Sequence, residues 1–342
     1  MARCLQLARL GEGSVAPNPM VGAVLVYEDR IIGEGWHRQF GGPHAEPNCI
    51  ASVKPEDLHL VAASTMYVSL EPCAHFGKTP PCADLLIQQK IKKVVIGCRD
   101  PFEQVNGKGI EKLKAAGIEV ITGVLEKECI DLNKAFFTFH NKKRPYIILK
   151  WARSSDGFIG RWKHDSHNRL MISNEITNRI VHKWRSEIPA IMVGTNTALQ
   201  DDPSLTTRLW KGASPTRLVI DRNLKLPLTA KLLDSSAPTI VYNYHNMGTQ
   251  DNIRYLKLDG HGNIVQQVLE DLFANKINSL LVEGGAQLLQ SFIDLDLWDE
   301  TRIITNRNLF VHDGVRAPVL KKGNKISSEM YGDNEVVYFE NP

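Results

Sequence analysis

Cysteine is absent from this chain after position 129. The six cysteines that precede that point are Cys4, Cys49, Cys73, Cys82, Cys98 and Cys129. Long apolar runs are missing too, since no stretch approaches the roughly 18 consecutive apolar residues of a membrane-spanning helix. The first 14 residues, interrupted by Arg3 and Arg9, hold no apolar h-region, so we expect no signal peptide. These absences predict a cytoplasmic protein whose cysteines are reduced, buried thiols or metal ligands.

A large excess of either charge is also missing. Lysine and arginine total 41 against 38 acidic residues, and the formal net charge is +3. An RNA-binding module with structural zinc would need a basic face with interleaved aromatic residues, and the charges here are spread along the chain. We therefore expect a small-molecule substrate, with neither nucleic acid nor membrane as a partner. The absence of repeats and low-complexity tracts excludes a solenoid, and homo-oligomerisation is left open.

The length of 342 residues favours two domains. In both halves strand patterns alternate with helix patterns, which is typical of α/β domains. The first half predicts strands at 21–27, 30–36, 65–70, 93–97 and 118–124, and helices at 4–10, from 44 onward, and at 83–90, 110–116 and 126–140. The second predicts strands at 146–151, 190–194, 216–221, 239–244 and 279–283, and helices at 176–186, 264–275 and 286–294. The charged run 141–145, which ends in proline, predicts domains at 1–143 and 144–342.

Three short motifs in the first half carry metal-binding chemistry: His44-Ala45-Glu46, Glu71-Pro72-Cys73 and Pro80-Pro81-Cys82. A catalytic zinc site takes three nitrogen or sulfur ligands and leaves the fourth position to water. His44, Cys73 and Cys82 supply that set. Glu46 is placed to take a proton from the water and pass it to a leaving amine.

The alternative is a structural zinc site, which has four protein ligands and often Cys-x-x-Cys pairs. Cys73 and Cys82 are separated by eight residues, and His75 is the one evident fourth candidate. The motifs therefore favour a catalytic site. Sulfur-rich ligation favours zinc over magnesium or calcium.

The string from Glu71 to Cys82, EPCAHFGKTPPC, resembles the riboflavin-pathway deaminase, as does Ala16-Pro17-Asn18-Pro19-Met20-Val21-Gly22. It departs from the general deaminase pattern Pro-Cys-x-x-Cys by its longer spacing. In domain order the chain resembles the bifunctional riboflavin biosynthesis deaminase/reductase. The resemblance implies a cytidine-deaminase-like α/β/α sandwich followed by a dihydrofolate-reductase-like α/β domain.

By this resemblance, the first domain removes ammonia from 2,5-diamino-6-(ribosylamino)pyrimidin-4-one 5'-phosphate. Asn18 and His37 match positions beside the pyrimidine, and Lys78 and Thr79 match positions at the phosphate end. From the residues alone, the alternatives are a solvated loop lysine for Lys78 and a turn residue for Asn18. Pro47 replaces the family's aliphatic residue, which places the start of the helix close to Glu46.

Without the resemblance, the sequence of the second half indicates less about its function. It contains neither Gly-x-Gly-x-x-Gly after a strand nor a Walker loop. Three segments stand out: 194–197, which follows a predicted strand, 201–208, which is a polar loop, and 282–286, which lies between a predicted strand and a predicted helix. The last precedes a helix, where an anion can meet the helix N-terminus, although turn chemistry explains each segment as well.

The resemblance implies that this half reduces the ribosyl group to ribityl with hydride from NADPH. The implied substrate-side residues are Lys150, Ser154, Asp156, Arg185, Asp201, Arg208 and Glu283. The implied cofactor-side residues are Ser173, Thr195, Asn196, Gly284 and Gly285. Arg185 and Arg208 would bind the substrate phosphate, because a guanidinium fits phosphate bidentately. Asp201 is the candidate catalytic group, for stabilising an iminium as the ribose opens.

This half also departs from the family pattern. Met171 stands where the family commonly has tryptophan, and the preceding loop, 161–169, is slightly longer. The rival enzyme reading is a zinc nucleoside or tRNA deaminase with an accessory or inactive second domain. That reading leaves the insert at 78–79 and the long second half without a purpose.

Overall fold

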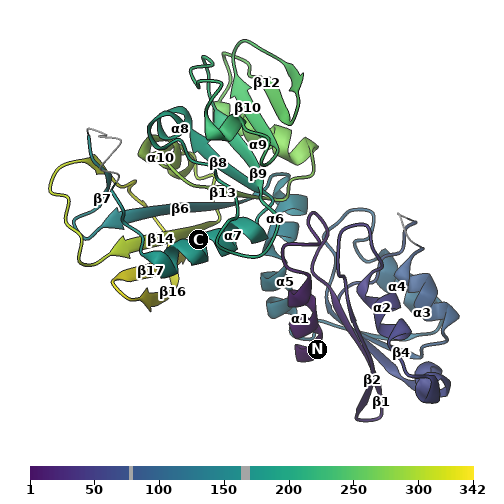
Figure 1. Ribbon diagram of the computed structural model, residues 1–342. Coiled ribbons are helices and arrows are strands. Elements are labelled where there is room, and N and C mark those ends of the chain that lie inside the picture. Colours follow the sequence, from purple (N-terminus) through teal and green to yellow (C-terminus); the bar gives the residue numbers. More distant parts are fainter. Residues whose placement is uncertain (77–79, 163–169) are drawn as a thin grey trace. The chain divides into compact units, whose positions relative to one another are not determined.

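In the computed structural model, residues 1–76, 80–162 and 170–342 are described. The chain divides into two compact units, Met1–Lys143 and Arg144–Pro342, whose helices and strands are labelled in Figure 1. Within the described ranges, no helix combines the length and apolar character needed to span a membrane.

The first unit is built on a five-stranded sheet. Across the sheet the strands are β2 (Arg30–Trp36), β1 (Gly22–Tyr27), β3 (Thr65–Leu70), β4 (Lys93–Cys98) and β5 (Glu119–Thr122). β1 runs antiparallel to β2 and β3, whereas β3, β4 and β5 are parallel. The parallel strands are joined through helices, as a parallel pair requires.

Helices cover both faces of this sheet. Alternate residues of β1 face opposite ways, so Ala23 and Leu25 join one core cluster and Val24 joins another. The first cluster takes side chains from α2 (Ala45–Ala51), α3 (Cys82–Gln88) and α4 (Lys108–Ala115). The opposite face is packed by α1 (Ala2–Ala8), α5 (Glu126–Leu132) and α6 (Lys134–Lys142). The predicted three-layer sandwich is confirmed.

One helix prediction in this unit is wrong. The segment 126–140 forms two helices, α5 and α6, separated at Asn133. The Asn133 side chain accepts the Met20 N–H at 2.8 Å and donates to the Met20 carbonyl at 2.9 Å. This paired contact ties the helix break to the loop before β1, a tertiary constraint that helical periodicity does not reveal.

The second unit contains a ten-stranded sheet. Its strands, in spatial order, are β11 (Gly248–Gln250), β12 (Ile253–Lys257), β10 (Thr239–Asn243), β9 (Thr216–Ile220), β8 (Ala190–Gly194), β13 (Ser279–Val282), β6 (Tyr146–Ser154), β14 (Glu300–Asn306), β17 (Asn334–Glu340) and β16 (Asn324–Tyr331). The strands from β12 through β14 are parallel, and antiparallel strands flank them. A small sheet pairs β7 (Phe158–Gly160) with β15 (Val315–Arg316).

The main core of this unit lies between the sheet and two helices, α9 (Ile264–Ala274) and α10 (Ala286–Asp294). Val268 and Leu272 of α9 and Phe292 of α10 are fully buried there. Two further helices flank β8 in the chain: α7 (Glu175–Glu187) precedes it and α8 (Thr195–Asp201) follows it. The carboxyl ends of parallel strands and the helix termini after them are where α/β sheets bind ligands.

Several elements of the second unit were not predicted. The segment 195–201, to which the sequence pattern assigns no helix, forms α8. The strands β14 to β17 also lie beyond the predicted elements, and β16 is exposed along nearly its whole length. An exposed strand lacks the apolar alternation that reveals a half-buried one.

Candidate metal centre and reductase site

Three elements of the first unit place the predicted metal ligands. His44 is the residue immediately before α2, Cys73 follows β3, and Cys82 is the first residue of α3, after Pro81. The Cys82 N–H donates to the Cys73 Sγ at 3.3 Å, and the Ala83 N–H donates to the Cys73 carbonyl at 3.1 Å. The start of α3 is thereby fastened to the loop that carries the first thiol.

The geometry of this cluster fits a divalent metal. The ligand atoms of His44, Cys73 and Cys82 all lie within 4.8 Å of one another. The His44 Nδ1 is 3.6 Å from the Cys73 Sγ and 3.3 Å from the Cys82 Sγ. Ligands of tetrahedral zinc, at bond lengths of about 2.0 to 2.3 Å, lie about 3.5 to 3.8 Å apart. The donor set of one nitrogen and two sulfurs therefore suits zinc.

Electrostatics favour an ionised sulfur in the cluster. The hydrogen bond with Cys82 lowers the pKa of Cys73 to about 4, against the opposing effect of burial. His44 adds to this lowering through its own hydrogen bond. A thiolate is the form of cysteine that binds metals.

The residues predicted around the metal cluster lie beside it. Glu46, in the first turn of α2, is 3% exposed, and burial raises the pKa of its carboxyl group. The His37 ring lies edge-on to that of His44, with centroids 5.4 Å apart. Asn18 Nδ2 is 3.1 Å from His37 Nε2, and His37 Nδ1 is 3.0 Å from the Pro43 carbonyl. Asn18, His37 and Glu46 thus come together with His44, while Lys78 and Thr79 lie outside the described residues.

Sequence reasoning gave no role to Glu71, which precedes the Pro72-Cys73 pair. Its buried carboxylate accepts four backbone N–H groups, from Asp100, Gly107, Gly109 and Ile110, at 2.9 to 3.2 Å. Glu71 therefore joins the ligand loop to the start of α4. Only a tertiary contact reveals this role, because the donors lie about 30 to 40 residues away in the chain.

In the second unit, a buried ion pair joins α7 to the end of β13. Arg185 donates from Nε and Nη2 to the Glu283 carboxylate at 3.1 and 2.7 Å. Lys150 of β6 reaches the same carboxylate at 3.8 Å. Burial by itself raises the pKa of Glu283, but Arg185 and Lys150 outweigh it and lower that pKa to about 2. Three predicted substrate-side residues therefore form one cluster.

Arg208 is connected to this cluster through the loop after α8. Arg185 Nη1 donates to the Thr206 carbonyl at 3.4 Å, and Arg208 Nη1 donates to the Thr206 hydroxyl at 3.0 Å. The Arg208 backbone N–H donates to His182 Nδ1 at 2.9 Å. Sequence reasoning missed His182. Its position three residues before Arg185, on the same face of a predicted helix, was the available signal.

Ser154 and Asp156 form a separate group. The Ser154 hydroxyl donates to Asp156 at 2.6 Å, and the backbone N–H groups of Val311 and His312 also donate to this carboxylate. The hydrogen bond from Ser154 is the largest cause that lowers the pKa of Asp156, to about 2. Asp156 thus holds the segment after β14.

Two of the predicted cofactor-side residues, Gly284 and Gly285, bring the segment before α10 against Thr197 of α8. Gly284 and Gly285 have φ of +134° and +75°, and a Cβ on either would lie 3.0 to 3.1 Å from the Thr197 side chain. Thr195, the first residue of α8, donates its hydroxyl to the Ile220 carbonyl. The remaining predicted residues are placed as follows: Asn196 is second in α8, Asp201 ends α8, and Ser173 lies just before α7.

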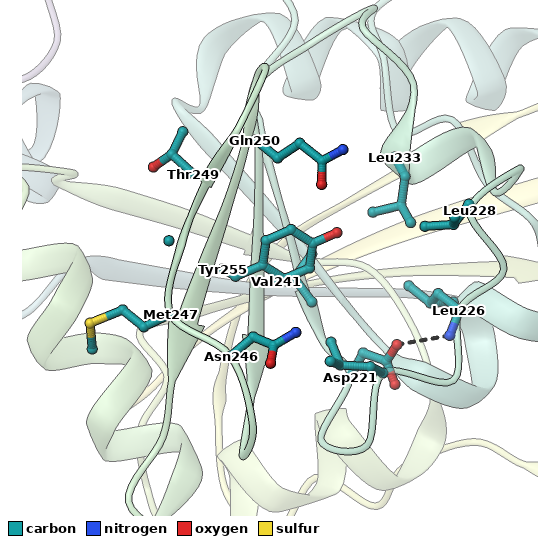
Figure 2. A pocket seen from close by; sticks show the side chains of 12 residues that line it. Asp221, Leu226, Leu228, Leu233, Val241, Asn246, Met247, Thr249, Gln250 and Tyr255 are labelled. Atoms are coloured by element: carbon teal, nitrogen blue, oxygen red, sulfur yellow. Dashed lines mark hydrogen bonds between the residues drawn. The ribbon is translucent and has the colours of Figure 1, made fainter.

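A cavity of about 440 Å³ lies elsewhere on the same unit. Figure 2 shows Leu226, Leu228 and Leu233 on one side of it, with Val241 and Tyr255 between them and the 246–250 segment. None of its lining residues belongs to the predicted sites. The predicted site residues of this unit lie instead in the polar clusters described above.

Comparison with known proteins matches both units. Residues 1–98 match the family described as the cytidine and deoxycytidylate deaminase zinc-binding region, and residues 145–308 match the RibD C-terminal domain. The chain is 37% identical to riboflavin biosynthesis protein RibD of Aquifex aeolicus, over 99% of this chain and 97% of that protein. It is 33% identical to the Escherichia coli RibD, over 88% of this chain and 84% of that protein.

Solved structures agree with this match. The diaminohydroxyphosphoribosylaminopyrimidine deaminase/5-amino-6-(5-phosphoribosylamino)uracil reductase of Thermotoga maritima superposes with a TM-score of 0.89 at 36% identity, over 99% of this chain and 97% of that one. RibD of Acinetobacter baumannii gives a TM-score of 0.88 at 31% identity, with the same coverage. Relatives that span both units support the bifunctional reading over a deaminase with an accessory second domain. The chain therefore belongs to the RibD family of riboflavin biosynthesis enzymes, with a zinc-binding deaminase domain followed by a reductase domain of a family that uses a nicotinamide cofactor.

Proposed function

We propose that the first domain, 1–143, hydrolyses 2,5-diamino-6-(ribosylamino)pyrimidin-4-one 5'-phosphate and that the second, 144–342, reduces the ribosyl group of the product with NADPH. The observation that carries the first step is the convergence of His44, Cys73 and Cys82 with the buried Glu46 beside them. His44, Cys73 and Cys82 hold zinc. When bound, zinc supplies a water molecule acidic enough to react at neutral pH.

The residues of the first domain then orient the pyrimidine and move a proton. Glu46 takes the proton of the attacking water and delivers it to the 2-amino group, which leaves as ammonia while a carbonyl group replaces it. Asn18 hydrogen-bonds the ring, and His37 holds the Asn18 amide at 3.1 Å. Lys78 and Thr79 bind the phosphate end.

In the second domain the cluster around Glu283 places the substrate. Arg208 is exposed and donates to Thr206 through one Nη atom, so its guanidinium has donors left for the 5'-phosphate. Arg185 is paired with Glu283 and adds positive charge beside it. Lys150, Ser154, Asp156 and Glu283 complete the substrate side, and Asp201 stabilises the iminium that forms when the ribose ring opens.

NADPH, when bound, supplies the hydride that reduces C1' of the opened sugar. Gly284 and Gly285 allow its phosphates to approach the start of α10, and Ser173, Thr195 and Asn196 also contribute to the cofactor side. The Thr195 hydroxyl is already donated to Ile220, so we assign Thr195 an orienting role in the start of α8. We place the protein in the cytoplasm, in keeping with its six free cysteines.

One assay tests both steps. The zinc-loaded protein is incubated with the diaminopyrimidine phosphate, first without and then with NADPH. We expect ammonia release without NADPH, followed by NADPH oxidation that depends on the deaminated product. Ammonia release with no NADPH oxidation at any substrate concentration would contradict the reductase half alone.

A further inference from the structure

His182 lies on α7 one turn before Arg185 and is 6% exposed. Residues three apart occupy the same face of a helix, so both side chains point toward the loop that carries Arg208. The contacts bear this out: the Arg208 N–H donates to His182 Nδ1 at 2.9 Å, and Arg185 Nη1 donates to the Thr206 carbonyl at 3.4 Å. Two side chains of one helix therefore hold the backbone of a single short segment.

The segment from Leu205 to Arg208 begins with an unfavourable backbone conformation. Leu205 has a φ of +51°, a left-handed conformation that is unfavourable for a residue with a side chain. The next residue, Thr206, accepts a hydrogen bond from the Arg208 side chain at 3.0 Å. The contact with His182 is the one that fixes Arg208 through its own backbone.

Burial and the positive charges around His182 keep its imidazole neutral. The groups facing it are Arg185 on the same helix, Arg208 on the loop, Lys150 of β6 and Glu283 after β13. Burial, followed by Arg185 and Arg208, lowers the pKa of His182 to about 4. Near neutral pH the Nδ1 is therefore an acceptor, as the N–H of Arg208 requires, and the ring proton is on Nε2.

We infer that His182 is a positioning residue of the reductase, which fixes Arg208 for recognition of the substrate's 5'-phosphate. The inference rests on the proposed function, in which Arg208 contacts that phosphate. His182 acts through Arg208 and takes no part in hydride transfer. Its loss should therefore weaken binding of phosphorylated substrate and leave the turnover number nearly unchanged.

Side-chain geometry provides a matched pair of variants. An asparagine amide oxygen lies as many bonds from Cα as the histidine Nδ1 does, whereas the glutamine amide lies one bond farther out. His182→Asn should keep the acceptor for Arg208, and His182→Gln and His182→Phe should lose it. The exposed neighbour Lys183 provides the control variant Lys183→Ala on the same helix.

The full-length protein is assayed for reductase activity with the pyrimidine riboside in its phosphorylated and phosphate-free forms. For His182→Gln and His182→Phe we expect KM of the phosphorylated form to rise by about 10- to 100-fold, the effect of leaving a backbone donor unpaired. We expect kcat and the KM of the phosphate-free form to change by less than about 3-fold, the scatter of neutral surface substitutions. His182→Asn and Lys183→Ala should resemble the unmodified protein, and ammonia release should be unchanged in all four variants.

Two outcomes would overturn the inference. If KM rises equally for the phosphorylated and phosphate-free forms, His182 has only a structural role. If His182→Asn loses as much affinity as His182→Gln, the Nδ1 acceptor is not what matters. The variant Arg208→Ala tests the proposed function separately from the role of His182. If Arg208→Ala keeps the preference for phosphorylated substrate, Arg208 does not bind the phosphate, and the role inferred for His182 is then wrong as well.

Discussion

The backbone N–H of Cys82 points at the sulfur of Cys73, 3.3 Å away, so α3 begins on the thiol that its own first residue helps to ionise. A helix start favours nearby negative charge through its free N–H groups and its dipole. The helix α3 therefore supplies the ligand Cys82 and also stabilises the thiolate of the ligand Cys73. His44, just before α2, completes the set from another helix start.

Replacing Glu46 by glutamine should abolish deamination and leave zinc in place. The amide keeps the size of the carboxylate but cannot accept and release the proton, and general acid–base catalysis contributes about 10²- to 10⁴-fold. Ammonia release and zinc content measure the two effects, with NADPH oxidation on supplied deaminated product as the internal control. Near-normal ammonia release by Glu46→Gln would exclude the proton-transfer role.

Replacing Cys82 by serine should remove the metal, because an alcohol is a much poorer zinc ligand than a thiolate. The matched control is Cys4→Ser, since the Cys4 thiol is buried away from the cluster and its contact with the Tyr67 carbonyl suits a hydroxyl equally. Atomic absorption should find about one zinc per chain in the control and almost none in Cys82→Ser. Full zinc content in Cys82→Ser would remove Cys82 from the ligand set.

Glu283 should make the second unit sensitive to acid. Its pKa is lowered from the usual range near 4.5 to about 2, so its stabilising effect is complete above pH 4.5 and is lost as the pH falls toward 2. Each pKa unit corresponds to about 1.4 kcal/mol, so the full effect is about 3 kcal/mol. Glu283→Gln should therefore be less stable than the unmodified protein at pH 7, by a margin that shrinks between pH 4.5 and 2.

Urea unfolding at several pH values measures this margin. Tryptophan fluorescence is a suitable signal because all tryptophans other than Trp36 lie in the second unit. A margin that stays constant from pH 7 to 2 would show that the charge of Glu283 does not stabilise the fold.

Gly284→Ala should impair use of NADPH more than its backbone strain explains. Gly284 has a φ of +134°, and an added Cβ would lie 3.1 Å from Thr197 Cγ2. The control is Gly157→Ala, where φ is +87° and the space around the added Cβ is open. Both variants should lose about 1 to 3 kcal/mol of stability. Only Gly284→Ala should raise KM for NADPH, and equal KM values in the two variants would separate Gly284 from the cofactor.

The sequence by itself determined the chemistry of the first unit. The types and order of His44, Glu46, Cys73 and Cys82 indicated a three-ligand metal centre with an acid–base group, since few other purposes need those side chains in that pattern. Apolar runs predicted all five strands of the first sheet and five of the ten strands of the second. Pro47 placed the start of α2 close to Glu46, and α2 begins at Ala45. Motifs and apolar runs involve residues that are close together in the chain, so they can be recognised without knowing the fold.

The tertiary structure decided the contacts between distant segments. Three such contacts join residues that lie far apart in the chain. They are the hydrogen bonds from four backbone N–H groups to Glu71, the contact of Asn133 with Met20 at the helix break, and the hydrogen bond between Arg208 and His182. Hydrogen bonds of this kind leave no period or spacing in the sequence, because their partners are brought together only when the sheets form. The antiparallel strands β17 and β16 were likewise decided by pairing, of β17 with β14 and of β16 with β17, since strand pairing satisfies backbone groups whatever the side chains are.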